Sequence, residues 1–204
     1  MIEVEVKVSI SDPDLYRKKF IKHKGSYLAS FLHEDTYYNM PEGLRDFKST
    51  DEALRIRKSI EYHKNKKEPR QKPNYFITYK GAKLDTSTKT RKEMETHIDE
   101  GEVLKKILKI LGFREILTVK KERDLYDFVY KQKKIEVLID YIPILEQSFI
   151  EAEILAEKEE QIKVYRELLF EFLSEFGIEK KESIRRSYLE LIVIELIKKG
   201  DFSL

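Results

Sequence analysis

Apolar and polar residues alternate strictly over residues 2–10, which predicts a β-strand with one buried face and one polar face. The sequence Ser-Asp-Pro follows, a combination typical of a helix N-terminus, so we expect a helix over residues 13–24 that ends at a glycine. Further segments rich in apolar and β-branched residues predict strands at residues 27–40, 53–60, 74–80, 88–98, 113–121, 124–131, 135–142 and 149–155.

Apolar residues recur at helical spacing in three later segments, residues 101–111, 162–176 and 184–199. Together these elements predict an α+β fold, built on a closed or nearly closed antiparallel β-barrel of about eight strands with helices packed outside. No repeat or long linker divides the sequence. We therefore expect one domain over residues 1–204, whose C-terminal helices, about 157–200, pack on the barrel.

Composition adds constraints on class and location. The 204 residues include no cysteine, which excludes disulfides and thiolate metal sites, and no apolar stretch reaches the roughly 20 residues that span a bilayer. No secretory signal pattern opens the chain, so we expect a cytoplasmic protein without a membrane partner. Charged residues make up 38% of the chain but nearly cancel to a formal +2, and this density leaves adaptation to high temperature as a side hypothesis.

Charged residues on the predicted strands follow a repeated pattern. Glu3, Glu5 and Lys7 share one face of the first strand, and exposure to water would explain one such strand alone. The same parity returns on later strands, with mainly acidic pairs separate from a basic pair: Arg55 with Arg57, Arg91 with Glu93 and Glu95, Glu136 with Asp140, and Glu151 with Glu153.

Three more basic residues belong to this pattern. Lys80 ends a predicted strand, while Lys121 and Arg123 lie in a continuous charged run where parity cannot choose a face. A triphosphate would explain both signs, because Arg and Lys grip its oxygens while carboxylates hold Mg²⁺ or Mn²⁺ against the same oxygens. Enclosed in one barrel, the two sets would also offset each other's desolvation. The pattern predicts an interior, metal-dependent site for a triphosphate-containing small molecule.

An ordered series of short motifs runs along the chain. In sequence they are Glu-Val-Glu-Val-Lys at residues 3–7, Leu-Arg-Ile-Arg at 54–57, Thr-Tyr-Lys-Gly at 78–81, Arg-Lys-Glu-Met-Glu at 91–95, and further matches at 121–123, 137–140, 149–153 and 186–191. The series resembles the CYTH superfamily, the triphosphate tunnel metalloenzymes, whose members include class IV adenylyl cyclases, thiamine triphosphatases, inorganic triphosphatases and RNA 5′-triphosphatases. The resemblance spans nearly the whole chain.

The resemblance implies a role for each motif residue. Metal binding would fall to Glu3, Glu5, Glu151 and Glu153. Phosphate binding would fall to Lys7, Arg55, Arg57, Lys80, Arg91, Lys121, Arg123 and Arg186. Catalysis would also involve Glu93, Glu95, Asp140 and Lys80, with the two glutamates contributing a second metal position or orienting water. The implied reaction is in-line attack by metal-activated water on a terminal phosphorus.

Two alternative functions stay open. A class IV adenylyl cyclase needs the same cage, although such cyclases resemble one another in a His-Phe element several residues before ExExK, where only Met1 and Ile2 stand here. A non-catalytic nucleotide or polyphosphate-binding module would gain affinity by losing its carboxylates, so the intact acidic pairs argue against it. The sequence does not distinguish inorganic triphosphate, ATP, thiamine triphosphate or an RNA 5′ end, and no other nucleic-acid partner is expected.

Several remaining features favour ordinary structural roles. The histidines at 33, 63 and 97 lack paired ligand spacing and are expected at the surface or with satisfied hydrogen bonds. The aromatic residues at 31, 37 and 38 are expected in the core. Residues 61–73 predict a polar, basic surface loop that could steer polyanions. The last helix is apolar enough that a homodimer interface is an alternative to packing on the barrel.

Overall fold

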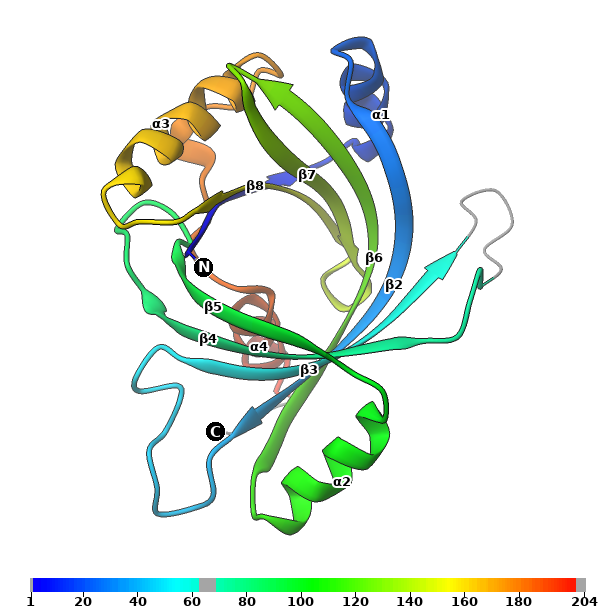
Figure 1. The fold of residues 1–204 in the computed structure, drawn as a ribbon, viewed down its shortest axis with the longest axis vertical. Coiled ribbons are helices and arrows are strands. Elements are labelled where there is room, and N and C mark those ends of the chain that lie inside the picture. The colour runs from blue at the N-terminus through cyan, green and yellow to red at the C-terminus, as the bar shows by residue number, and fades with distance from the viewer. Residues whose placement is uncertain (1, 63–68, 201–204) are drawn as a thin grey trace.

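The structure, a computed structural model, describes residues 2–62 and 69–200. Its eight strands close into one antiparallel barrel in the order β1-β5-β4-β3-β2-β6-β7-β8 (Figure 1). This confirms the predicted α+β barrel. The strands are β1 (Ile2–Ile10), β2 (Ser26–Asn39), β3 (Ala53–Tyr62), β4 (Asn74–Lys83), β5 (Arg91–Ile98), β6 (Arg114–Tyr130), β7 (Lys133–Ile142) and β8 (Gln147–Ala156).

Four α-helices accompany the barrel. They are α1 (Pro13–Lys22), α2 (Gly101–Ile110), α3 (Gln161–Ser174) and α4 (Tyr188–Lys199), with short 3₁₀ turns at Pro143–Leu145 and Lys180–Glu182. The predicted start of α1 is confirmed, because the Asp12 side chain accepts a hydrogen bond from the Leu15 amide at 2.9 Å. Within the described residues, no helix is long and apolar enough to span a membrane.

One long strand replaces two predicted ones. The expectation of separate strands over residues 113–121 and 124–131 is wrong, because β6 runs unbroken from Arg114 to Tyr130. The charged run in its middle suggested a break. In the barrel, Lys121 and Arg123 are buried while Lys120 is exposed. The charged run therefore continues the strand, with Lys121 and Arg123 on its inner face, a choice of face that the sequence left open.

Outward-facing apolar residues of the strands form the largest core. Val4, Val6 and Val8 are buried under the helices, packed in one cluster with Phe20 of α1 and Leu169 of α3. A smaller cluster joins α2 to the outside of β2 and β3. The inner face therefore carries the polar positions of β1, the reverse of an ordinary barrel with an apolar interior.

The last helix occupies a position that the sequence did not predict. Its apolar side packs with Val119 and Phe149, which share strand faces with Lys121 and Glu151 and so point into the barrel. In Figure 1, α4 is seen behind the ring of strands rather than outside it. Thus α3 packs outside as expected, but α4 fills one end of the interior, which we call the plugged end. There it shields the inward-facing apolar residues from water.

Candidate active site

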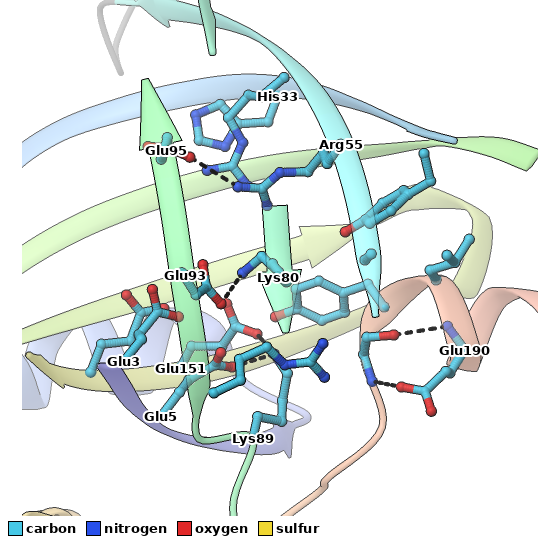
Figure 2. A pocket seen from close by; sticks show the side chains of 18 of the residues that line it. Glu3, Glu5, His33, Arg55, Lys80, Lys89, Glu93, Glu95, Glu151 and Glu190 are labelled. Atoms are coloured by element: carbon cyan, nitrogen blue, oxygen red, sulfur yellow. Dashed lines mark hydrogen bonds and ion pairs between the residues drawn. The ribbon is translucent and has the colours of Figure 1, made fainter. Parts of the chain in front are cut away.

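A cavity of about 1330 Å³ runs through the barrel. It lies between α4 at the plugged end and the strand ends opposite. Its lining contains carboxylates and cations from several strands, and most of the predicted site residues belong to it: Glu3, Glu5, Arg55, Arg57, Lys80, Arg91, Glu93, Glu95, Lys121, Arg123, Glu151 and Glu153. Figure 2 shows Glu3, Glu5 and Glu151 on one side of this cavity and His33 and Arg55 on the other.

Three carboxylates gather on the wall formed by β1 and β8. One oxygen from each of Glu3, Glu5 and Glu153 lies within 4.8 Å of the others. Burial and the neighbouring Glu3 and Glu5 raise the pKa of Glu153 well above its ordinary value, and burial and the Glu151 carboxylate raise the pKa of Glu5 to about 8. An oxygen-only cluster that repels its own charge fits a hard divalent cation, which would offset that repulsion.

Glu151 lies next to this cluster but is engaged by cations. It accepts hydrogen bonds from Lys89 Nζ at 2.9 Å and Arg123 Nη2 at 2.7 Å. Burial would raise the pKa of Glu151, but Lys89 and Arg123 hold that pKa well below its ordinary value. Glu151 is thus ionised and paired. Lys89 Nζ also donates to Glu5, so within the described residues this lysine joins Glu151 to the acidic cluster of Glu3, Glu5 and Glu153.

Cations converge on Tyr188 at the plugged end of the cavity. The Nζ atoms of Lys7, Lys121 and Lys89 lie 4.0, 5.2 and 5.7 Å from the centroid of its ring. Burial and the nearby Lys89 lower the pKa of Lys7 to about 7, and burial and Arg123 lower that of Lys121 to about 8. Within the described part of the chain, Lys7 Nζ finds no hydrogen-bond partner, but the side chain is fully buried 4.0 Å from Glu151 and does not line the cavity, so its contact with phosphate stays a prediction.

Buried carboxylates orient the arginines. Asp140 accepts both Nε and Nη2 of Arg123 at 2.6 Å and also accepts the Tyr188 hydroxyl at 2.9 Å. Nearby on β2 and β3, Arg57 donates to both oxygens of Asp35 at 2.7 and 2.9 Å. Such two-point pairs fix a guanidinium in one orientation.

A second set of pairs lies on β3, β4 and β5. Lys80 Nζ donates to Glu93 at 2.5 Å, and Arg55 Nη2 donates to Glu95 at 3.2 Å. Thr78 Oγ1 also donates to Glu95, at 2.6 Å. Basic and acidic groups on these three strands therefore hold one another in place.

The sequence matches the model of the CYTH domain over residues 1–188. The chain belongs to the CYTH family. It is 38% identical over 192 residues to a protein of Methanocaldococcus jannaschii named "putative adenylate cyclase", covering 94% of this chain and 98% of that one. Proteins of this family act on nucleotide triphosphates and depend on metal ions.

Solved structures share the fold. The PH1819 protein of Pyrococcus horikoshii superimposes with a TM-score of 0.79 at 36% identity, covering 95% of this chain and 99% of that one. A Hippeastrum protein described as a "putative adenylyl cyclase" with a dominant triphosphatase activity superimposes with a TM-score of 0.61 at 18% identity, covering 100% of this chain and 98% of that one. The second likeness shows the fold alone.

Three of the predicted site residues, Lys7, Asp140 and Arg186, do not line the cavity. Arg186 is exposed and does not line the cavity, whereas its neighbour Arg185 donates to the backbone oxygen of Asp85 at 2.9 Å. Arg91 is buried at the edge of the cavity, 4.0 Å from Asp51. Phosphate contact by Arg186 is therefore not supported by its position.

Three residues that the motif search passed over lie inside this CYTH site. Lys89 lies two residues before Arg91 in a segment predicted as a strand, so alternation over residues 88–98 would have placed it on the face of Arg91, although the structure has it in the loop before β5. Asp35 lies on β2, where alternation by itself does not choose the inner face. Tyr188 stood within the C-terminal motif, but only the fold shows that α4 carries it into the barrel.

The structure corrects the expectation for one histidine. His33 is buried in the cavity wall, and its Nδ1 has no hydrogen-bond partner within residues 2–62 and 69–200, so it is neither exposed nor satisfied there. His97 is half-exposed and lies 3.4 Å from Asp99, while His63 falls outside the described residues. Phe31 also differs from expectation, because it lines the cavity instead of joining a core.

The predicted basic loop is described only at its edges. Arg70 donates to Glu61 at 2.6 Å, and the β3 strand extends to Tyr62, further than expected. The lysines at 64, 66 and 67 lie outside the described residues. The steering role of this loop stays a prediction.

Proposed function

We propose that this CYTH protein is a Mg²⁺- or Mn²⁺-dependent triphosphatase, hydrolysing inorganic triphosphate or an organic triphosphate by in-line attack of water on the terminal phosphorus. One observation carries the proposal. The acidic cluster of Glu3, Glu5 and Glu153 shares a single cavity with buried lysines and arginines. A site for a bare anion would not need the cluster, and a site for a bare cation would not need the lysines and arginines.

Glu3, Glu5 and Glu153 would hold the metal ion. A divalent cation bound there supplies charge neutralisation at the phosphate oxygens and a lowered pKa for coordinated water. The carboxylate of Glu151 would take a lesser part, since Lys89 and Arg123 already engage it. Its contribution is to keep those two cations pointed into the cavity.

The chain's cations would bind the phosphates from several directions. Arg123 and Arg57, fixed by Asp140 and Asp35, present guanidinium groups that suit phosphate oxygens. At the plugged end, Lys7, Lys89 and Lys121 surround Tyr188, so the terminal phosphoryl group would lie where positive charge is densest. Glu93 and Glu95, held by Lys80 and Arg55, would orient the attacking water.

Concentration of lysines at the plugged end favours hydrolysis over cyclisation. Charge that develops on a terminal phosphoryl group during water attack would be stabilised there. Cyclisation places the reacting centre at the α-phosphate instead, nearer to the substrate's organic group. The same cage would nevertheless support class IV adenylyl cyclase activity, and the relative in Methanocaldococcus jannaschii carries that name.

Product analysis tests the proposal. The purified protein is incubated with Mg²⁺ or Mn²⁺ and inorganic triphosphate, ATP or thiamine triphosphate, and the products are identified by chromatography. Release of orthophosphate supports a triphosphatase. Cyclic AMP together with pyrophosphate from ATP would replace it by the cyclase, and no turnover of any triphosphate would leave a non-catalytic binding module.

A further inference from the structure

One stretch of the charged inner wall is apolar and aromatic. Phe31, His33, Phe76 and Leu125, which we call the aromatic arc, all line the cavity. Within the described residues, Phe31, Phe76 and Leu125 belong to none of the three hydrophobic clusters that hold the helices on the barrel. Apolar side chains left facing a polar cavity are unfavourable in water, so their position calls for a ligand with an apolar surface.

The aromatic arc adjoins the phosphate-binding arginines. Strand register places Phe31 directly opposite Arg123 on β6 and Phe76 directly opposite Arg57 on β3. Side chains so paired on one face of a sheet are neighbours. A ligand whose phosphates meet the two arginines would therefore carry its next chemical group over the two rings.

His33 gives the aromatic arc a polar contact. The side chain is only 5% exposed, its ring centroid is 5.4 Å from that of Phe31, and its Nδ1 lacks a hydrogen-bond partner among the described residues. Burial and the nearby Arg57 lower the pKa of His33 well below its ordinary value. A neutral imidazole is a weak phosphate ligand, but it offers a donor and an acceptor that match the polar edge of a heterocycle.

The cavity itself fixes which end of a substrate meets the aromatic arc. On β2 and β6, the residues that pack with α4 are Tyr37 and Val119, and Phe31, His33 and Leu125 lie toward the opposite end of the same two strands. Lys89 and Lys121 line the cavity near Tyr188 at the plugged end. A triphosphate would enter with its terminal phosphate first, which leaves the attached group at the arc.

We infer that the aromatic arc is a binding subsite for an aromatic heterocycle carried on the triphosphate, with Phe31 and Phe76 stacking on the ring and His33 hydrogen-bonding to its edge. This inference rests on the proposed triphosphate site and narrows its substrate class. The preferred substrate is an organic triphosphate with a heteroaromatic group, such as a nucleobase or a thiamine ring system. Inorganic triphosphate would contact only the metal ion and the lysines and arginines of the cavity.

Paired kinetics with two substrates test the inference. With Mn²⁺ present, KM and kcat are measured for ATP and for inorganic triphosphate in the wild type and in Phe31→Ala, Phe76→Ala and His33→Ala. Loss of one stacking ring is expected to raise KM for ATP roughly tenfold, while KM for inorganic triphosphate stays within about twofold. Met94→Ala, at an exposed position on β5 outside the cavity, serves as the matched control.

The outcomes separate this inference from the proposed function. Equal effects on ATP and inorganic triphosphate, or no effect on either, would overturn the subsite. Cyclic AMP as the product would replace the triphosphatase but leave the subsite standing if the KM split persists. Phe31→Leu, which preserves volume without stacking, covers the case in which Phe31→Ala fails to fold.

Two further arms complete the design. Comparing kcat/KM for ATP, GTP and thiamine triphosphate identifies which heterocycle the subsite prefers. If no triphosphate is turned over, calorimetric titration with ATP and with inorganic triphosphate still tests whether the subsite binds a heterocycle. Tighter binding of ATP that is lost in Phe31→Ala supports the subsite, and equal binding of the two ligands contradicts it.

Discussion

Charged side chains in the barrel interior depend on one another at close range. Arg123 donates to Asp140 at 2.6 Å and to Glu151 at 2.7 Å, and all three residues are buried. Removing one member of such a group leaves a buried charge without its partner, which typically costs about 3–5 kcal/mol. Asp140 is therefore better described as the residue that positions Arg123 than as a group that reacts with substrate.

Replacement of a single cluster carboxylate should separate metal binding from folding. We expect Glu153→Gln to abolish the rise in Tm that Mn²⁺ gives the wild type and to lower turnover by on the order of a hundredfold. Without metal, the variant should be at least as stable as the wild type near neutral pH. Since burial, Glu3 and Glu5 raise the folded-state pKa of Glu153, ionising it costs stability as pH rises, and the amide avoids this.

Thermal unfolding and initial rates with and without Mn²⁺ measure both effects. The control is Glu136→Gln, because Glu136 also lines the cavity but lies outside the cluster of three. A Glu153→Gln protein that keeps the full Mn²⁺-dependent rise in Tm would contradict the metal assignment.

Among the elements, α4 and the loop between β4 and β5 shape the site most. The N-cap of α4 is a capping box in which the Ser187 hydroxyl accepts the Glu190 amide and Glu190 accepts the Ser187 amide. This fixes the first turn and directs Tyr188 at the three lysines. The loop, in turn, delivers Lys89 to Glu5 and Glu151.

The ring and the hydroxyl of Tyr188 should have separable effects. Tyr188→Phe removes the hydrogen bond to Asp140 and should lower the free energy of unfolding by about 1–3 kcal/mol, with little change in KM, because the ring over Lys7 remains. Tyr188→Leu also removes the cation–π contacts and should raise KM for the triphosphate several-fold. Urea denaturation and steady-state kinetics test this, and identical KM values for the two variants would exclude a positioning role for the ring.

Ionisation of Asp85 should make the stability of the loop between β4 and β5 depend on pH. Its carboxylate accepts the Ser87 and Thr88 amides at 2.7 and 2.9 Å and pairs with Arg166 of α3 at 2.7 Å. Burial would raise the pKa of Asp85, but the bonds from Ser87 and Arg166 lower it to about 2. The folded pKa lies below the usual 3.8, so the stabilisation is present above pH 3.8 and is lost as pH falls toward 2.

The wild type and Asp85→Asn are compared by urea denaturation at several pH values. We expect the variant to be less stable at pH 6, with the difference shrinking as pH falls below 4. A difference that stays constant between pH 6 and pH 3 would contradict ionisation of Asp85 as the source. The Asp85→Asn variant should also hydrolyse triphosphate more slowly, because the loop that Asp85 stabilises carries Lys89.

At the scale of the whole molecule, the barrel is closed unevenly. Strand β1 pairs with β8 along its entire length from Ile2 to Ile10, but with β5 the paired positions within the described residues are Ile2 with Lys92 and Glu3 with Arg91. The site spans this short seam, since Glu5 on one side contacts Lys89 on the other. Ligand binding would add cross-links where backbone pairing is sparse.

Amide hydrogen exchange should therefore be faster where β1 pairs only briefly with β5 than along β6. In the free protein, we expect amides near Lys92 to exchange faster than amides of β6, which pairs extensively with both neighbours. A non-hydrolysable triphosphate analogue with Mn²⁺ should slow exchange at the seam and leave β6 unchanged. Mass-spectrometric exchange with and without the ligand measures this, and uniform slowing across the barrel would indicate global stabilisation instead.

Some predictions about the molecule remain untested. A homodimer, a cytoplasmic location and adaptation to high temperature all stay predictions. The alternative use of α4 as a dimer interface loses its main argument, because Ile192 is already buried in the cluster at the plugged end.

Properties that depend on local periodicity can be predicted from the amino-acid sequence alone. Alternation along residues 2–10 gave the correct strand, its buried valines and its inward charges, and ordered motifs gave the family. Parity works because a strand sends successive side chains to opposite faces whatever it pairs with.

Which residues contact one another depends on how distant elements pack. The sequence treats Glu151 and Glu153 alike, yet one is paired with Lys89 and Arg123 while the other joins Glu3 and Glu5, because strand register and the loop before β5 choose their partners. It also could not show that α4 enters the barrel, since an amphipathic helix carries no record of which surface it covers. Contacts between elements far apart in the chain determine the acidic cluster, the plugged end and the aromatic arc.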